Sequence, residues 1–230
     1  MAKKFSTTTK IYFLRVFIST ALACMLFFLG AGQWDVTRGW IYYILAAVLT
    51  LTSNFIIAHH NPGLLEQRSR IRKGTKLWDK IWLFSFMLFF MYGMPLIAGY
   101  EIGRLHRQMA GISLPAGIVL FIISVILATW AMSVNKFFES SVRIQKDRGH
   151  HVIQTGPYQY VRHPGYSAII FWAVGYPMTV GSYMALITGL ILMAALVLRT
   201  VLEDLTLQKE LKGYSEYTRK VKYRLIPYIW

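Results

Sequence analysis

Long apolar runs separated by short basic segments are the feature that most limits what this chain can fold into. Five runs hold almost no charge: residues 11–32, 39–58, 81–100, 112–135 and 164–198. A helix needs about 20 mainly apolar residues to cross a bilayer. Only 15% of the residues are charged, whereas soluble domains carry about 25%. We therefore expect an all-α integral membrane protein and exclude a soluble globular domain.

The last apolar run, 164–198, differs from the others in length. It is too long for one membrane-spanning helix and barely long enough for two. Gly175-Tyr176-Pro177 and Gly181-Ser182 offer places for a break, because glycine and proline interrupt helices. We expect a tight hairpin of two short or tilted helices, which brings the total to about six transmembrane helices.

The distribution of basic residues predicts how these helices are oriented. With six spans, the segments on one side carry three, six, five and seven Lys or Arg residues, and the loops on the other side carry one, two and none. Because Lys and Arg are enriched in cytoplasmic loops, both termini of this multi-pass integral membrane protein are expected in the cytoplasm. The net charge of +15 is explained by basic residues in the loops on the cytoplasmic side of the membrane, so no nucleic-acid partner is expected. Membrane lipids are expected partners of the basic tail: Arg219, Lys220, Lys222 and Arg224.

A polar, turn-rich stretch, residues 149–166, lies between two apolar runs. Gly156-Pro157 and His163-Pro164-Gly165 interrupt it, since a residue before proline avoids the helical conformation. Its backbone groups would be left without partners against lipid, so the stretch must fold into protein or line a wet cavity. We expect it to form a cytoplasmic site together with the tail that follows the hairpin.

Two groups of short motifs resemble the signature of one family of membrane-embedded enzymes. The first group occupies the polar stretch: His150-His151-Val152-Ile153, Gly156-Pro157-Tyr158 and Arg162-His163-Pro164-Gly165-Tyr166. The second group follows the last apolar run: Glu203-Asp204 and Gly213-Tyr214-Ser215-Glu216-Tyr217, then a basic tail. In this order they are similar to the isoprenylcysteine carboxyl methyltransferase family, with the phospholipid N-methyltransferases as relatives. The resemblance divides the chain into N-terminal transmembrane helices (1–134) and a methyltransferase signature region (135–230).

This resemblance implies an S-adenosylmethionine-dependent methyltransferase that acts on a lipophilic or membrane-delivered acceptor, at a carboxylate or a thiol. It implies a cytoplasmic cofactor-binding loop and a helical C-terminal tail that closes over the cofactor. The cofactor-binding residues that it implies are Gln145, His150, His151, Val152, Ile153, Tyr158, His163, Pro164, Gly165, Tyr166, Glu203 and Asp204. The catalytic residues expected beside them are Arg199 and Glu203.

The spacing of Arg199, Glu203 and Asp204 predicts which of these charged side chains lie on the same face of a helix. Arg199 and Glu203 are four residues apart and share a helix face, and Asp204 is turned by about 100° from Glu203. Glu203 could hold the cofactor ammonium and Arg199 an anionic acceptor, or the two could form an ordinary ion pair at a helix end. No residue stands out as a general base, and this favours a carboxylate or thiolate acceptor over an amine.

Other functions remain open at this point. The closest alternative is a phospholipid N-methyltransferase, and an alternative from another class is a non-enzymatic transporter or scaffold. A transporter would carry charges midway through its spans, which are nearly free of charge here. No metal site is expected, because no HxxxH or CxxC spacing occurs and adjacent histidines seldom bind one ion. The sequence does not predict the oligomeric state.

Overall fold

The computed structural model describes residues 6–68 and 75–230 of the chain. Within these residues every regular element is helical, which confirms the expected all-α class. In chain order they are α1 (Thr7–Ala31), α2 (Thr37–His60), α3 (Pro62–Arg68), α4 (Leu77–Ser85), the π-helix η1 (Phe86–Gly93), α5 (Met94–Gly103), α6 (Ser113–Val134), the 3₁₀ turns η2 (Lys146–Arg148) and η3 (Gly156–Gln159), α7 (Pro164–Val180), α8 (Tyr183–Glu210) and α9 (Tyr214–Lys220). Five basic residues counted in the topology argument lie outside the described residues: Lys3, Lys4, Arg70, Arg72 and Lys73.

Five helical segments of the described chain are long and apolar enough to cross a membrane. They are α1, α2, the continuous rod Leu77–Gly103, α6 and α8. This is one fewer than the six that the sequence predicts, because α7 has only 17 residues. The protein is therefore a multi-pass membrane protein, and a crossing by α7 stays a prediction.

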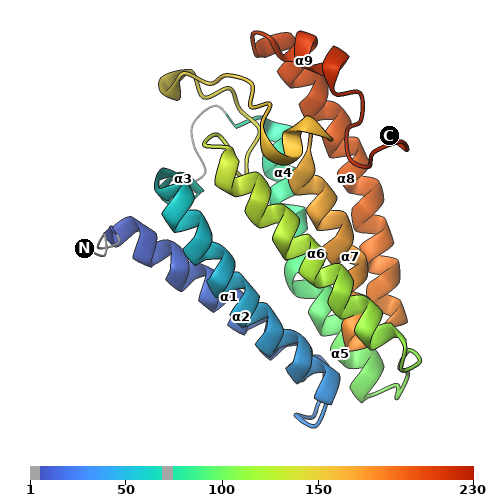
Figure 1. Cartoon of the computed structure of the whole chain (residues 1–230). Helices are drawn as coiled ribbons and strands as arrows, with labels where there is room; N and C mark the ends of the chain where they lie inside the picture. Colours follow the sequence, from blue (N-terminus) through green and yellow to red (C-terminus); the bar gives the residue numbers. More distant parts are fainter. Residues whose placement is uncertain (1–5, 69–74) are drawn as a thin grey trace.

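The apolar run 164–198 divides into α7 and α8 at Gly181-Ser182. Gly181 ends α7 with a positive φ of 90°, and the Ser182 hydroxyl caps α8 by accepting from the Ala185 amide at 3.0 Å. The alternative break at 175–177 is not used, since α7 continues through Pro177. Helices α7 and α8 pack against each other, so the ends of the run return to the same end of the bundle (Figure 1).

The rod that links α4 to α5 contains a π-helical segment just before Pro95. In η1 the hydrogen-bonding step is wider than in an α-helix, and the Met94 amide donates to the Phe89 carbonyl. Pro95 follows immediately and has no amide hydrogen to offer. The π segment thus accommodates the proline, and it also changes which side chains this part of the rod presents to its neighbours.

Small residues let several helices approach closely. A Cβ atom on Gly99 of α5 would lie 1.8 Å from the Phe27 carbonyl oxygen of α1, and one on Gly117 of α6 would lie 2.4 Å from the Thr179 amide nitrogen of α7. Such contacts are typical of helices packed in a membrane, where burial of apolar surface from water contributes little. They fix α5, α6 and α7 and thereby the end of the bundle where the polar loop begins.

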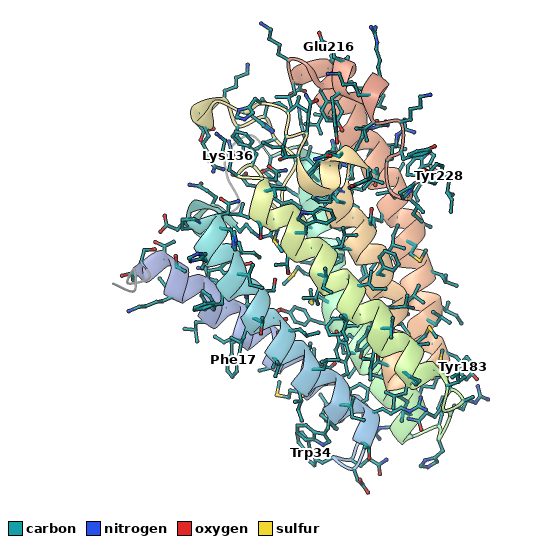
Figure 2. All side chains as sticks on the ribbon, viewed as in Figure 1. Phe17, Trp34, Lys136, Tyr183, Glu216 and Tyr228 are labelled. Atoms are coloured by element: carbon teal, nitrogen blue, oxygen red, sulfur yellow. The ribbon has the colours of Figure 1, made fainter. Side chains whose placement is uncertain are left out.

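One end of the bundle gathers the polar segments. Figure 1 shows the loop between α6 and α7, the start of α4, the last turns of α8 and α9 together at this end. Along the bundle many large apolar side chains are exposed, as lipid-facing residues are: Ile126 is 62% exposed, and Phe17, which points outward in Figure 2, is 61% exposed. The site described next therefore lies where the apolar bundle meets the polar loop.

Candidate active site

A cavity of about 390 Å³ lies at this end of the bundle, between the rod, the loop 135–163, the start of α7, α8 and α9. Twelve of the thirteen residues predicted for the site line it: Gln145, His150, His151, Val152, Ile153, Tyr158, His163, Pro164, Gly165, Tyr166, Arg199 and Glu203. The two halves of the signature, which are far apart in the chain, therefore meet around one space. The binding role of each residue stays a prediction.

Asp204 is the exception, because its carboxylate lies behind the cavity wall. Asp204 is fully buried and accepts from Arg162 Nε and Nη2, each at 2.9 Å, and from the Tyr214 hydroxyl at 2.9 Å. His163 Nε2, Arg224 Nε and the Gln208 amide each lie 3.1 Å from a carboxylate oxygen. With both oxygens engaged in this way, Asp204 holds the wall together, and its direct contact with a cofactor stays a prediction.

Arg162 extends this buried cluster to the C-terminal tail. Its Nη1 donates to the carbonyl oxygens of Val221 and Lys222, each at 2.9 Å, and its amide donates to the Tyr223 carbonyl at 3.0 Å. Arg162 belongs to one of the sequence motifs, but no individual role was predicted for it. One sequence feature could have predicted its role: it is an arginine in a turn-rich stretch with no charged neighbour. If such a guanidinium is buried, it requires a carboxylate partner.

Glu203 of α8 faces the cavity, whereas its sequence neighbour Asp204 is buried behind the wall. The Tyr166 hydroxyl donates a short hydrogen bond to Glu203 Oε2, and Tyr166 also stacks on His163 with the ring centroids 5.6 Å apart. Among the described residues no further hydrogen bond or ion pair of the Glu203 carboxylate is found. A half-buried carboxylate with a free oxygen on a cavity wall suits a ligand cation.

Arg199 does not pair with Glu203, contrary to one of the two readings of their spacing. Its Nε and Nη2 donate to Asp79 Oδ1 at 3.1 and 2.7 Å, and Nη2 also donates to the Ser140 carbonyl at 2.8 Å. The guanidinium carbon lies 3.9 Å from the centre of the Trp82 ring. The plane of the Arg199 side chain is therefore fixed before any ligand arrives.

Asp79 is a site residue that was not predicted from the sequence. It lies in the first turn of α4, is fully buried, and accepts from the Val142 amide at 2.6 Å through its second oxygen. It thus joins the rod, the loop and α8. One sequence feature could have predicted its role, namely a carboxylate directly before an apolar run. Such a carboxylate needs a partner where the helix enters the bundle.

The loop itself is braced from within by Gln145 and His150. The Gln145 amide nitrogen donates to the Phe137 carbonyl at 2.7 Å, its side-chain oxygen accepts from Arg148, and its backbone amide lies 3.3 Å from His150 Nδ1. The His150 ring packs on Phe137 with centroids 4.5 Å apart. The segment from His150 to Ile153 forms no regular secondary structure.

The packing of His150 predicts a pH-dependent stability. Burial, followed by the charges of His151, Arg143 and Arg148, lowers the pKa of His150 from its ordinary 6.5 to about 4. Between these values the unfolded chain binds the proton and the folded chain does not. The stability that neutral His150 contributes is therefore complete above about pH 6.5 and is lost as the pH falls towards 4.

We expect the melting temperature of the purified wild-type protein to fall between pH 7.5 and pH 5, and to fall less in His150→Gln, which has no imidazole to protonate. His151→Gln is the matched control, because that ring is exposed and it should keep nearly the wild-type pH response. An equal fall in wild type and His150→Gln would show that another group carries the pH dependence.

Tyrosines from the loop and from α9 close the remaining wall. The Tyr217 hydroxyl donates to the Tyr158 carbonyl at 2.6 Å, and Asn135 Nδ2 donates to the Tyr158 hydroxyl at 2.8 Å. Burial, followed by the charge of Asp204, raises the pKa of Tyr214 far above its ordinary value, so this hydroxyl remains a donor. Helix α9 is thus locked onto the loop around the cavity.

The cavity has a polar part and an apolar part. Charged and hydrogen-bonding groups come from the loop and α8: Asn135, Glu139, His163, Arg199 and Glu203. Apolar side chains come from the rod and α7: Leu83, Phe86, Met87, Met91 and Ile169. Met87 also reaches the outer surface of the bundle, where it is 42% exposed. A polar ligand and an apolar chain can therefore meet in one space.

Comparison with known proteins supports the resemblance seen in the motifs. The model of the isoprenylcysteine carboxyl methyltransferase (ICMT) family matches residues 117–209. Two curated relatives, from Oryza sativa subsp. indica and Oryza sativa subsp. japonica, are each described as a "Probable protein-S-isoprenylcysteine O-methyltransferase". Each is 30% identical over 108 residues, which is 46% of this chain and 56% of the relative, so the match spans about half the length of these proteins. The residues matched by the family model run from α6 to the last turn of α8 and include the loop that lines the cavity.

Proposed function

We propose that this protein is an integral membrane methyltransferase that uses S-adenosylmethionine to methylate a carboxylate on a lipophilic or membrane-delivered acceptor. The observation that carries the proposal is a cavity that joins a polar wall from the signature motifs to an apolar wall from the rod. The family match over 117–209 and the described activity of the relatives agree with it. A lipidated acceptor suits the apolar part, because Met87 links that part to the bundle surface.

The residues of the polar wall fit the chemical groups of S-adenosylmethionine. Glu203 offers a carboxylate for the ammonium group, and the apolar side chains of Val152, Ile153 and Leu207 offer a surface for the adenine. The volume of about 390 Å³ falls within the usual range of roughly 300–1,000 Å³ for small-molecule sites. When bound, the cofactor supplies a methyl group on a positively charged sulfur, which is already activated for transfer.

The protein therefore has to align the acceptor with the methyl group and exclude water. Arg199, held by Asp79 and stacked on Trp82, presents a guanidinium of fixed orientation to an anionic acceptor. An ionised carboxylate needs no general base. The tyrosines of α9 and the loop keep the polar wall closed, because their hydroxyls stay protonated and hydrogen-bonded.

We also propose that α7 crosses the membrane as a sixth, short span, which places both termini in the cytoplasm. Its 17 residues measure about 25 Å at about 1.5 Å per residue, close to the roughly 30 Å of a hydrocarbon core. In a Cys24→Ser background, Lys212→Cys should resist an impermeant thiol reagent added outside intact cells, and Arg107→Cys should react. Labelling of both positions from outside would contradict the six-span topology.

Glu203→Gln should weaken the binding of cofactor. The change keeps the size of the side chain and its bond to Tyr166 but removes the charge, and a charge-assisted hydrogen bond contributes about 1.5–3 kcal/mol. We expect affinity for S-adenosylhomocysteine, measured by calorimetry on detergent-purified protein, to fall roughly tenfold to a hundredfold. Glu210→Gln, an exposed carboxylate on the same helix, is the control. Wild-type affinity in a folded Glu203→Gln protein would remove Glu203 from the cofactor site.

The enzymatic proposal is tested with methyl-labelled cofactor and two acceptors, an S-prenylated cysteine and a phosphatidylethanolamine. A methyl ester releases volatile methanol in alkali, whereas an N-methyl group does not. Alkali-labile product from the first acceptor supports the proposal. Alkali-stable label in the phospholipid would identify the N-methyltransferase alternative. Failure to bind cofactor at all would favour a scaffold.

A further inference from the structure

The last nine residues, 222–230, fold back on themselves as a tail hook. The amides of Arg224, Leu225 and Ile226 donate to the carbonyl oxygen of Trp230 at 2.8, 3.0 and 3.4 Å. Tyr228 at the bend has a φ of 66°, a conformation that non-glycine residues rarely adopt. The hook therefore holds one defined shape at a local conformational cost, and such a cost at an exposed turn calls for an explanation.

The tip of the tail hook presents apolar side chains to its surroundings. Tyr228 is 88% exposed, Ile229 75% and Ile226 37%. Figure 2 shows Tyr228 projecting sideways from the bundle next to α8, at about the height of Lys136, which follows the end of the membrane-spanning α6. Glu216 of α9, in contrast, lies at the far end of the polar segments (Figure 2). The apolar tip thus lies level with the end of the hydrophobic bundle.

Basic residues lie just before this tip in the chain. The side chains of Arg219, Lys220 and Lys222 are exposed, and none of these three side chains has a hydrogen bond or ion pair within the described chain. Tyr side chains favour the membrane–water interface, and clustered Lys and Arg favour anionic headgroups. Arg224 differs from the three, because it is bound to Asp204 and lies over the Trp230 ring.

We propose that the tail hook is an interfacial anchor, in which Ile226, Tyr228 and Ile229 insert into the headgroup region of the leaflet next to the cavity. The partner is an anionic lipid surface, which Arg219, Lys220 and Lys222 meet from the aqueous side. This arrangement removes the apolar tip from water and accounts for the strained conformation of Tyr228. It does not depend on the proposed enzymatic activity.

The base of the tail hook is tied to the signature motif of the cavity. The His163 amide donates to the Arg224 carbonyl at 2.9 Å, and the Ser167 hydroxyl donates to the Leu225 carbonyl at 2.5 Å. Arg224 also reaches the buried carboxylate of Asp204. An anchored hook therefore holds the start of α7 in place from the membrane side.

Site-specific fluorescence tests the anchor in the full-length protein. Cys24, the one cysteine of the chain, is replaced by Ser, and a bimane label is placed at Tyr228→Cys, at Ile229→Cys or at the control Glu216→Cys. The proteins are reconstituted into nanodiscs of phosphatidylcholine with or without phosphatidylglycerol. Lipids brominated near the headgroup quench a probe in the interface, and iodide quenches a probe in water.

At positions 228 and 229 we expect strong quenching by brominated lipid and an iodide quenching constant about fivefold lower than at 216, as for groups at headgroup depth. Lys220→Gln with Lys222→Gln should reduce the lipid quenching in nanodiscs that contain phosphatidylglycerol and leave it unchanged in pure phosphatidylcholine. Iodide quenching as strong at 228 as at 216 would overturn the proposal. Protection from both quenchers would also overturn it, because the tip would then be covered by protein.

Discussion

Replacing Asp204 with Asn is expected to lower the free energy of unfolding by about 3–5 kcal/mol, the usual cost of removing one partner from a buried ion pair. The substitution leaves the Arg162 guanidinium buried at 6% exposure without its counter-charge. It also turns two acceptor oxygens, which engage Arg162, His163, Tyr214 and Arg224, into one acceptor and one donor. The amide hydrogens of the introduced asparagine would point at groups that are themselves donors. The decrease in the free energy of unfolding should therefore be larger than removal of the charge alone would cause.

We expect the substitution to loosen the loop and the C-terminal tail before the whole protein unfolds, because Asp204 joins α8 to both of them. We expect trypsin to cut Asp204→Asn faster than wild type after Lys222 and Arg224, while α1 to α6 remain intact. Unfolding in detergent, followed by tryptophan fluorescence, measures the stability itself. Glu216→Gln is the matched control, since exposed substitutions change stability by about ±0.5 kcal/mol.

A double substitution, Asp204→Asn with Arg162→Gln, separates ion pairing from packing. If the pair carries the effect, the double variant should be more stable than the sum of the two single losses predicts. Equal stability of Asp204→Asn and Glu216→Gln would contradict the structural role. Direct contact with a ligand would then be the better explanation of the position of Asp204.

Local patterns were enough to predict the membrane-spanning helices and the segments that surround the cavity. The apolar runs needed no tertiary information, because a bilayer requires about 20 apolar residues in a row. The turn residues of 149–166 predicted a folded loop, and the helical hairpin between the two motif groups predicted that they would meet. The residues that line the cavity follow from these two features.

Pairing between distant charges could not be predicted in this way. Asp79 and Arg199 are 120 positions apart and meet because the rod packs against α8, which depends on the interhelical geometry. Spacing alone suggested Glu203 as a partner of Arg199, but tertiary structure offered a closer carboxylate. The same holds for Asp204, whose neighbour Glu203 faces the cavity while Asp204 faces the protein. The π-helical segment before Pro95 likewise has no signature in hydropathy.

Arg199→Lys is expected to leave cofactor affinity nearly unchanged and to reduce turnover by roughly tenfold to a hundredfold, the equivalent of one or more charge-assisted hydrogen bonds. Arg199 donates to Asp79 through two nitrogens and stacks on Trp82, so its plane is fixed. A lysine ammonium keeps the positive charge but has neither the planar fork nor the stacking face. An anionic acceptor would then be held without a defined orientation.

Asp79→Asn is the matched variant, because it keeps the guanidinium of Arg199 but removes the charge that orients it. The carbonyl oxygen of the introduced asparagine can still accept from the Val142 amide, so the loop contact survives. We expect KM for the acceptor to rise and kcat to fall, with affinity for S-adenosylhomocysteine close to wild type. Turnover should remain above that of Arg199→Lys, since the fork itself is still present.

The rival explanation is that Arg199 and Asp79 only join α8 to the rod. Breaking a buried pair would then lower the free energy of unfolding by about 3–5 kcal/mol in Asp79→Asn, and the molecules that remain folded would turn over at the wild-type rate. Measuring cofactor affinity, active fraction and turnover on one preparation distinguishes the two cases. Normal turnover per folded molecule in Arg199→Lys would make the pair purely structural. A parallel loss of cofactor affinity would instead place Arg199 in the cofactor site, because the acceptor is absent from that measurement.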